Sequence, residues 1–191
     1  MSDSMPGSIP DTTTTEQLAV IEQQLGRPAR GMSAIAYQSP EGVPMVLRME
    51  SLVDEKPFPT LYWLCSKDLH KAISRIETAG WVKLIEQELQ QDEALRNRYL
   101  ANHRDYVALR DRLMSEPIRR RIEQLGFADL FQQYGIGGIS QWDKVRCLHM
   151  QYAHYLSASE LSPDDNPQAG ANVIGERMEQ EFNLSQTLIT I

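Results

Sequence analysis

The sequence predicts a single α+β domain, in which a small, mostly antiparallel N-terminal sheet is packed by a larger set of α-helices. Three observations lead to this fold class. Runs rich in branched and aromatic residues, bounded by Pro and Gly, are confined to residues 34–65. From residue 66 onward the apolar residues recur at helical spacing. With 191 residues, 41% hydrophobic and 24% charged, the chain has the composition of an ordinary globular domain.

The first third of the chain contains the predicted sheet. Residues 1–14, rich in Ser, Thr and Pro, predict a disordered leader, and the domain is expected over residues 15–160. A short amphipathic helix over 16–25 is followed by three strands, expected at 34–37, 45–49 and 60–65. The last run is apolar on both faces, which predicts that it is the central, buried strand.

The rest of the domain is predicted to be helical. Gly80, Asp92 and Pro117 supply helix stop, cap and start signals. The expected helices cover about 67–79, 81–91, 93–114, 118–125 and 140–156, the last starting at a capping-box-like Ser140 and Asp143. Residues 161–191 hold five acids and Arg177, and predict an acidic C-terminal extension.

Charge and composition favour a cytoplasmic protein that does not bind nucleic acid or a membrane. The formal charge is −7, although eight arginines and three acids lie between residues 96 and 121. No apolar run approaches the ~20 residues that span a bilayer, and the N-terminus lacks a secretory signal. Two cysteines without an export signal are expected to be reduced thiols. The oligomeric state is left open.

A zinc site is one alternative that the cysteines and histidines suggest. Cys65, Cys147, His149 and His154 are ligand types that zinc takes. If residues 140–156 form one helix, however, Cys147 and His149 point about 200° apart, and Cys147 and His154 are separated by about 10.5 Å of helix. Geometry therefore predicts no metal ligands here, a core position for His149, and a second face with Cys147 and His154.

The long helix offers a different candidate site. His103, Tyr106 and Arg110 recur at i, i+3 and i+7, a donor-rich stripe suited to a carboxylate or phosphate. The full set of expected ligand-binding residues is Arg75, His103, Tyr106, Arg110, Lys144, Cys147 and His154. The competing interpretation is that the stripe ties the long helix to its neighbours through buried hydrogen bonds and an Arg–Glu pair, with Glu77 as partner.

These residues lead first to a non-catalytic protein that binds a small anion or a protein partner. One alternative is an enzyme that acts on a phosphorylated or acyl substrate, with Cys147 or a histidine as nucleophile or proton carrier. The other is a metal-binding protein with Cys and His ligands. The sequence has no P-loop, Gly-x-Ser-x-Gly or His-Glu-x-x-His motif, and it indicates no particular cofactor.

Several sequence blocks occur in an order that resembles a known family. They are Gly26-Arg-Pro28, Phe58 to Cys65, Ser74-Arg-Ile-Glu77, His103-x-x-Tyr106-x-x-x-Arg110, Val145 to His149 with His154, and Asn166-Pro167. Together they resemble the bacterial domain-of-unknown-function family numbered 501, from about Gln23 to Gly170. The resemblance implies no activity. Family members often have a cysteine before the Pro of the first hairpin, where this chain has Ser39, so a metal site that needs a third cysteine is not expected.

Overall fold

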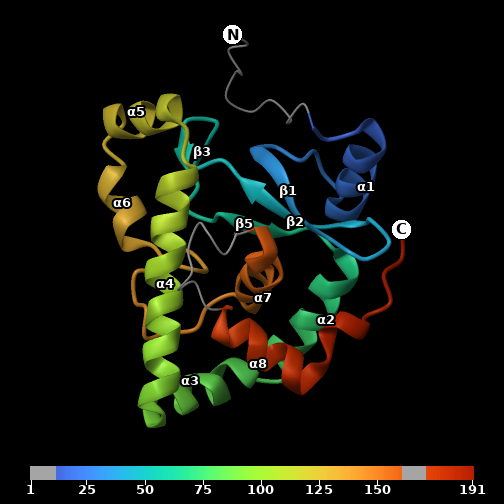
Figure 1. Cartoon of the computed structure of the whole chain (residues 1–191), viewed down its shortest axis with the longest axis vertical. Coiled ribbons are helices and arrows are strands. Elements are labelled where there is room, and N and C mark those ends of the chain that lie inside the picture. The colour runs from blue at the N-terminus through green and yellow to red at the C-terminus, as the bar shows by residue number, and fades with distance from the viewer. Residues whose placement is uncertain (1–11, 161–170) are drawn as a thin grey trace.

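The computed structural model describes residues 12–160 and 171–191, and within them it has the predicted α+β architecture, rich in helix (Figure 1). The α-helices are α1 (Thr15–Leu25), α2 (Lys67–Thr78), α3 (Trp81–Gln91), α4 (Glu93–Leu113), α5 (Glu116–Gln124), α6 (Ala128–Gln133), α7 (Leu148–Leu156) and α8 (Val173–Phe182). Two 3₁₀ turns are η1 (Ser157–Glu160) and η2 (Leu184–Gln186). The strands are β1 (Met32–Gln38), β2 (Pro44–Met49), β3 (Leu52–Val53), β4 (Lys56–Pro57) and β5 (Tyr62–Leu64).

The sheet is antiparallel, with strand order β1-β2-β5, and β3 and β4 form a separate two-stranded ribbon. Leu47 of β2 pairs with Ile35 on one side and with Trp63 on the other, so β2 is the central strand. The prediction that residues 60–65 form the central strand was wrong, because β5 lies at the sheet edge. Its apolar character reflects helices packed over it: Tyr62 stacks on His154 of α7 with ring centroids 6.0 Å apart.

Helix α7 lies in the middle of the molecule, between α2, α8, α4 and the sheet (Figure 1). Seven of its nine residues are buried, and Leu148 and Ala153 are completely inaccessible to solvent. They join the largest hydrophobic core together with residues of α2, α3, α4, α8 and the sheet. The central packing helix was predicted from sequence, and its position is confirmed.

The start of α7 differs from the prediction of a helix over residues 140–156. Residues 140–147 form turns, bends and irregular backbone, and the helix begins only at Leu148. Cys147 is the residue before it, with the left-handed dihedral angles φ 51° and ψ 82°. A residue with positive φ cannot continue a right-handed helix, so the chain changes direction at the cysteine.

Residues 171–191 pack against the domain instead of extending away from it. Val173, Ile174 and Met178 of α8 are buried in the largest core, and the side chain of Asn172 caps α8 by accepting from the backbone of Gly175. The expected extension over 161–191 did not anticipate this helix. Residues 161–170 of the expected extension and residues 1–11 of the expected leader lie outside the described residues. Among the described helices, none combines the length and apolarity that a membrane span requires.

Candidate functional site

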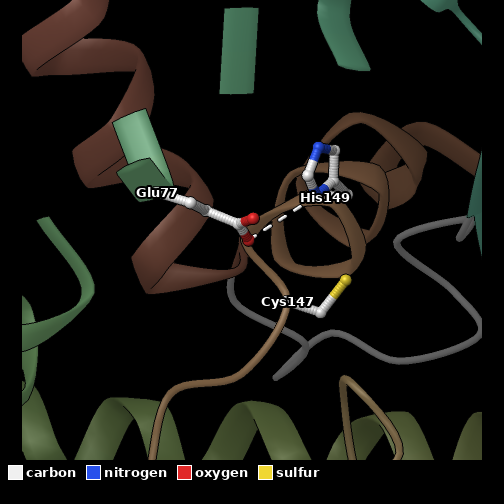
Figure 2. A group of neighbouring side chains, drawn as sticks. All are labelled: Glu77, Cys147 and His149. Carbon is white, nitrogen blue, oxygen red and sulfur yellow. Dashed lines mark ion pairs between the residues drawn. The ribbon is translucent and has the colours of Figure 1, made fainter. Parts of the chain in front are cut away.

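Glu77, Cys147 and His149 form a compact cluster where the last turn of α2 meets the N-terminus of α7. One carboxylate oxygen, the thiol sulfur and one imidazole nitrogen all lie within 4.8 Å of one another. Figure 2 shows the three side chains pointing toward a common centre, with Glu77 opposite the other two. We refer to these residues as the Glu77–Cys147–His149 cluster.

The backbone of α7 fixes the carboxylate of Glu77. Its Oε1 accepts a hydrogen bond from the backbone N–H of Leu148 at 2.8 Å. This N–H is one of the unpaired donors at a helix N-terminus, where the positive end of the helix dipole also favours an anion. The carboxylate of Glu77 is therefore held in place within the cluster, even though its side chain is about a third exposed (31%).

The imidazole of His149 is oriented by α2. Its Nε2 lies 3.1 Å from the carbonyl oxygen of His70 and 3.2 Å from Oγ of Ser74. A carbonyl oxygen only accepts, so we assign the proton of the neutral imidazole to Nε2, which donates it to the carbonyl oxygen of His70. The ring of His70 stacks on the ring of His149, with centroids 4.1 Å apart. The imidazole thus presents Nδ1 to the cluster.

Nδ1 of His149 faces Oε1 of Glu77 at 3.5 Å. With the proton on Nε2, both of these atoms are acceptors, and two lone pairs at this separation repel each other unless positive charge lies between them. A second proton on the imidazole or a bound cation would supply that charge. A cation would also be within reach of the sulfur of Cys147.

Cys147 is half-buried at the N-cap position of α7. Burial raises the pKa of its thiol, the backbone N–H groups of Met150 and His149 act in the opposite direction, and the charge of Glu77 raises the pKa further. The N–H groups at the start of α7 therefore favour a thiolate at Cys147, whereas the nearby carboxylate of Glu77 disfavours it. A divalent cation at the cluster would remove this conflict, because metal ions stabilise a coordinating thiolate.

The donor set suits a metal ion better than a proton relay. In a relay of cysteine, histidine and carboxylate, the histidine uses one ring nitrogen for each partner. Here Nε2 is held by α2, and the remaining ligand atoms converge on one point from three directions. The prediction that Cys147 and His149 cannot share an ion assumed that both lie on one regular helix. Cys147 precedes the helix, so this geometric objection no longer applies.

The stripe predicted on α4 is buried and bonded to the protein backbone. Nδ1 of His103 accepts from the N–H of Ile136, and the hydroxyl of Tyr106 accepts from the N–H of Leu61. Arg110 is 1% exposed and donates to the carbonyl oxygens of Pro59, Phe131 and Tyr134. These contacts tie α4 to its neighbours, as the competing interpretation expected, although the partners are backbone groups and Glu77 is not among them.

The other predicted residues lie in separate places. His154 is buried beside Tyr106, with ring centroids 5.2 Å apart, and its Nδ1 accepts from the amide of Asn172 at 3.1 Å. Arg75 is exposed on α2, and Lys144 is half-exposed in the segment before Cys147. Of the seven predicted ligand-binding residues, Cys147 is the one that joins the cluster; whether the others contact a ligand stays a prediction.

The family model described as "Protein of unknown function (DUF501)" matches residues 35–179. The chain belongs to this family. The match confirms the resemblance inferred from the sequence blocks, and it spans all three residues of the Glu77–Cys147–His149 cluster. Searches of the curated proteins and of the solved structures found no match. The DUF501 description carries no activity, so the function has to be inferred from the site.

In this DUF501 protein, sequence reasoning overlooked Glu77, Ser74 and His70 as site residues. They recur at i, i+4 and i+7 on α2, and this spacing places a histidine, a hydroxyl and a carboxylate on one helix face. The signal was present but not specific, since only the fold shows that α7 begins opposite this face.

Proposed function

We propose that this protein binds a transition-metal ion with the ligand preferences of Zn²⁺ through Glu77, Cys147 and His149. The observation that carries the proposal is the convergence of one oxygen, one sulfur and one nitrogen ligand atom, all within 4.8 Å of one another. Ligand atoms around a tetrahedral zinc ion are about 3.3–3.8 Å apart, so binding requires them to close in by roughly 1 Å. A thiolate and an imidazole favour zinc over magnesium or calcium.

The surroundings of the ligands support a metal site. Metal-bound histidines usually donate their second N–H to a carbonyl or carboxylate, as His149 does to the carbonyl of His70. The bond from Leu148 to Glu77 orients the carboxylate in the same way. Three protein ligands leave a fourth tetrahedral position for water or substrate, which is typical of catalytic zinc. A zinc-bound water at that position would be acidic enough to act as a nucleophile near neutral pH.

A catalytic thiol at Cys147 is the second candidate. The position of Cys147 at the N-terminus of α7 favours this hypothesis, because helix N-termini stabilise thiolates. Against it, burial and Glu77 raise the thiol pKa, and His149 uses its Nε2 for α2. Metal binding uses all three side chains, whereas a thiol nucleophile gives the carboxylate of Glu77 no chemical role beyond capping α7.

A cobalt titration tests the metal proposal. Chelator-treated full-length protein is titrated with Co²⁺, whose bond to a thiolate gives a charge-transfer absorption in the near ultraviolet, and the Co²⁺ is then displaced by Zn²⁺. We expect one ion per chain, and loss of the thiolate band in Cys147→Ser. His149→Ala should weaken binding strongly.

Cys65 provides the matched control. It is 2% exposed, its Sγ lies 3.3 Å from the carbonyl oxygen of Pro44, and burial raises its pKa to about 12. Cys65→Ala should therefore keep the cobalt band. If the wild-type protein binds no Co²⁺ or Zn²⁺, or if Cys147→Ser retains the band, the metal proposal fails. If the wild-type protein binds no metal and Cys147 is alkylated rapidly and selectively, the catalytic-thiol hypothesis is favoured instead.

A further inference from the structure

Arg110 is a buried cation that has no carboxylate within ion-pair distance in residues 12–160 and 171–191. Its side chain is 1% exposed, and its two terminal nitrogens donate to backbone carbonyl oxygens of Pro59, Phe131 and Tyr134. The guanidinium also lies over the rings of Tyr106 and Phe131, at 5.6 and 5.3 Å. Carbonyl and ring dipoles stabilise the positive charge but do not neutralise it.

One polar atom of this guanidinium is left over. Nε of Arg110 is buried and has no hydrogen-bond partner in the described structure. An arginine side chain has five N–H donors, and a buried donor without an acceptor costs free energy. An anion beside Arg110 would satisfy both the charge and the unused donor.

A polar cavity adjoins this arginine. Its volume is about 180 Å³, and it lies between the sheet and the C-terminal end of α4. The polar and charged side chains around it belong to Ser33, Arg48, Glu50, Ser51 and Arg110. Nε of Arg48 donates to Oγ of Ser33 at 3.4 Å, which places this guanidinium at the cavity wall. Two guanidinium groups and two hydroxyl-bearing residues in so small a space suit an oxyanion, and the cavity is too small for a large organic ligand.

We propose that this cavity binds a phosphate group, held by Arg48 and Arg110, with Glu50 as the acceptor that selects it. An unprotonated carboxylate in an anion site repels a fully deprotonated oxyanion such as sulfate. It accepts a hydrogen bond from a phosphate that still carries a proton. The sequence predicted an anion site with Arg110, His103 and Tyr106, whereas this cavity approaches Arg110 from the side of the sheet.

Glu50 is the residue on which the selectivity depends. It is half-buried, and burial raises its pKa while the charge of Arg48 lowers it. Glu50→Gln keeps the size and polarity of the side chain but removes the negative charge and adds donors. This substitution should leave the fold intact and change the preference between the two anions.

Isothermal titration of the full-length protein at constant ionic strength tests the proposal, with inorganic phosphate, sulfate and glycerol phosphate as ligands. We expect saturable binding of phosphate and roughly ten-fold weaker binding of sulfate, as the loss of a charge-assisted hydrogen bond implies. In Glu50→Gln, sulfate should bind about as well as phosphate. Glycerol phosphate that binds as tightly as phosphate would identify the ligand as an attached phosphate group, and much weaker binding would identify it as the free ion.

Two further variants make the result decisive. Ser51→Ala should weaken phosphate binding, while Arg104→Gln, which removes an exposed cation of α4 outside the cavity, should not. Absence of saturable binding, or equal effects of phosphate, sulfate and chloride, would overturn the proposal. So would a Glu50→Gln variant with unchanged preference between phosphate and sulfate.

Discussion

Glu77 on α2 accepts the backbone N–H of Leu148, the first residue of α7, at 2.8 Å. The same oxygen lies 3.5 Å from Nδ1 of His149. One carboxylate thus caps the central helix and faces the imidazole of the candidate metal site. Because the cap requires an acceptor and the metal requires a negative charge, two substitutions at Glu77 separate the roles.

Glu77→Gln should retain most of the stability and lose most of the metal affinity. The amide oxygen can still accept from Leu148, but the carboxylate ligand is gone. Glu77→Ala should lose both, with a decrease of about 1–2 kcal/mol in the free energy of unfolding for the missing cap. Urea denaturation of the metal-free proteins and Co²⁺ titration measure the two effects. A Glu77→Gln variant that binds Co²⁺ as tightly as wild type would exclude Glu77 as a ligand.

Ser74→Ala should weaken metal binding without destabilising the fold. The hydroxyl of Ser74 lies 3.2 Å from Nε2 of His149. Together with the carbonyl oxygen of His70, it orients the imidazole ring. Removing such an outer partner commonly costs about ten-fold in affinity or more. Thr78→Ala, one turn further along α2 with an exposed side chain that bonds to the helix backbone, is the control. Equal affinities for the two variants would show that Ser74 does not position the ligand.

Local sequence signals explain most of the helices. Asp92 accepts from the backbone of Leu95 and caps α4 as predicted, and the apolar spacing of α2 and α3 gives their buried faces. These features depend on residues within one or two turns of each other. The pattern could therefore be read without knowledge of the fold.

The candidate site could not be read in this way, because the start of α7 is decided by a contact between residues 71 positions apart in the chain. Ser140 and Asp143 offered a local start signal, yet the structure caps the helix with Glu77 and turns the chain at Cys147, where φ is positive. A non-glycine residue with positive φ is uncommon and has no reliable sequence signature. Fold-level packing brought together Cys147 and His149, which the helical wheel had separated.

The free energy of unfolding should fall as the pH is lowered from about 6.5 to about 4, in part because of His154. Burial lowers the pKa of His154 in the folded protein to about 4 from the ordinary value of 6.5. Between these values the unfolded chain binds a proton that the folded protein does not, so acid favours unfolding. The contribution of this histidine is about 3 kcal/mol, and it stops growing below pH 4.

His154→Gln isolates this contribution. The variant loses the stacking on Tyr62 and should be less stable at neutral pH, but its stability should decline less between pH 6.5 and pH 4. His103, whose pKa burial lowers to about 3, remains in both proteins and accounts for part of the residual slope. Parallel pH profiles from urea denaturation of the two proteins would contradict a neutral, buried His154.

Gly175→Ala should destabilise the contact between α7 and α8. A Cβ built at Gly175 would lie 2.2 Å from Cβ of Tyr155 and 3.2 Å from the carbonyl oxygen of Gln151. Both atoms belong to or adjoin the backbone of α7, so the helices must move apart, at a cost of about 1–3 kcal/mol. Gln180→Ala, at an exposed position of α8, should change stability by less than about 0.5 kcal/mol. Similar melting temperatures for the two variants would be incompatible with this close helix crossing.

Arg110→Leu should be among the most damaging single substitutions in the chain. The arginine joins α4 to three carbonyl oxygens, those of Pro59, Phe131 and Tyr134, and these acceptors would be left without their donors. A buried acceptor left without its donor costs about 1–3 kcal/mol, and here three acceptors are affected. Arg104→Leu, at an exposed position on the same helix, is the comparison, and it should cost less than about 1 kcal/mol. Arg110 also lines the proposed phosphate cavity. Phosphate should therefore raise the melting temperatures of wild type and of Arg104→Leu, and it should not raise that of an Arg110→Leu variant that folds. An Arg110→Leu variant as stable as Arg104→Leu would mean that the three carbonyl bonds contribute little to the fold.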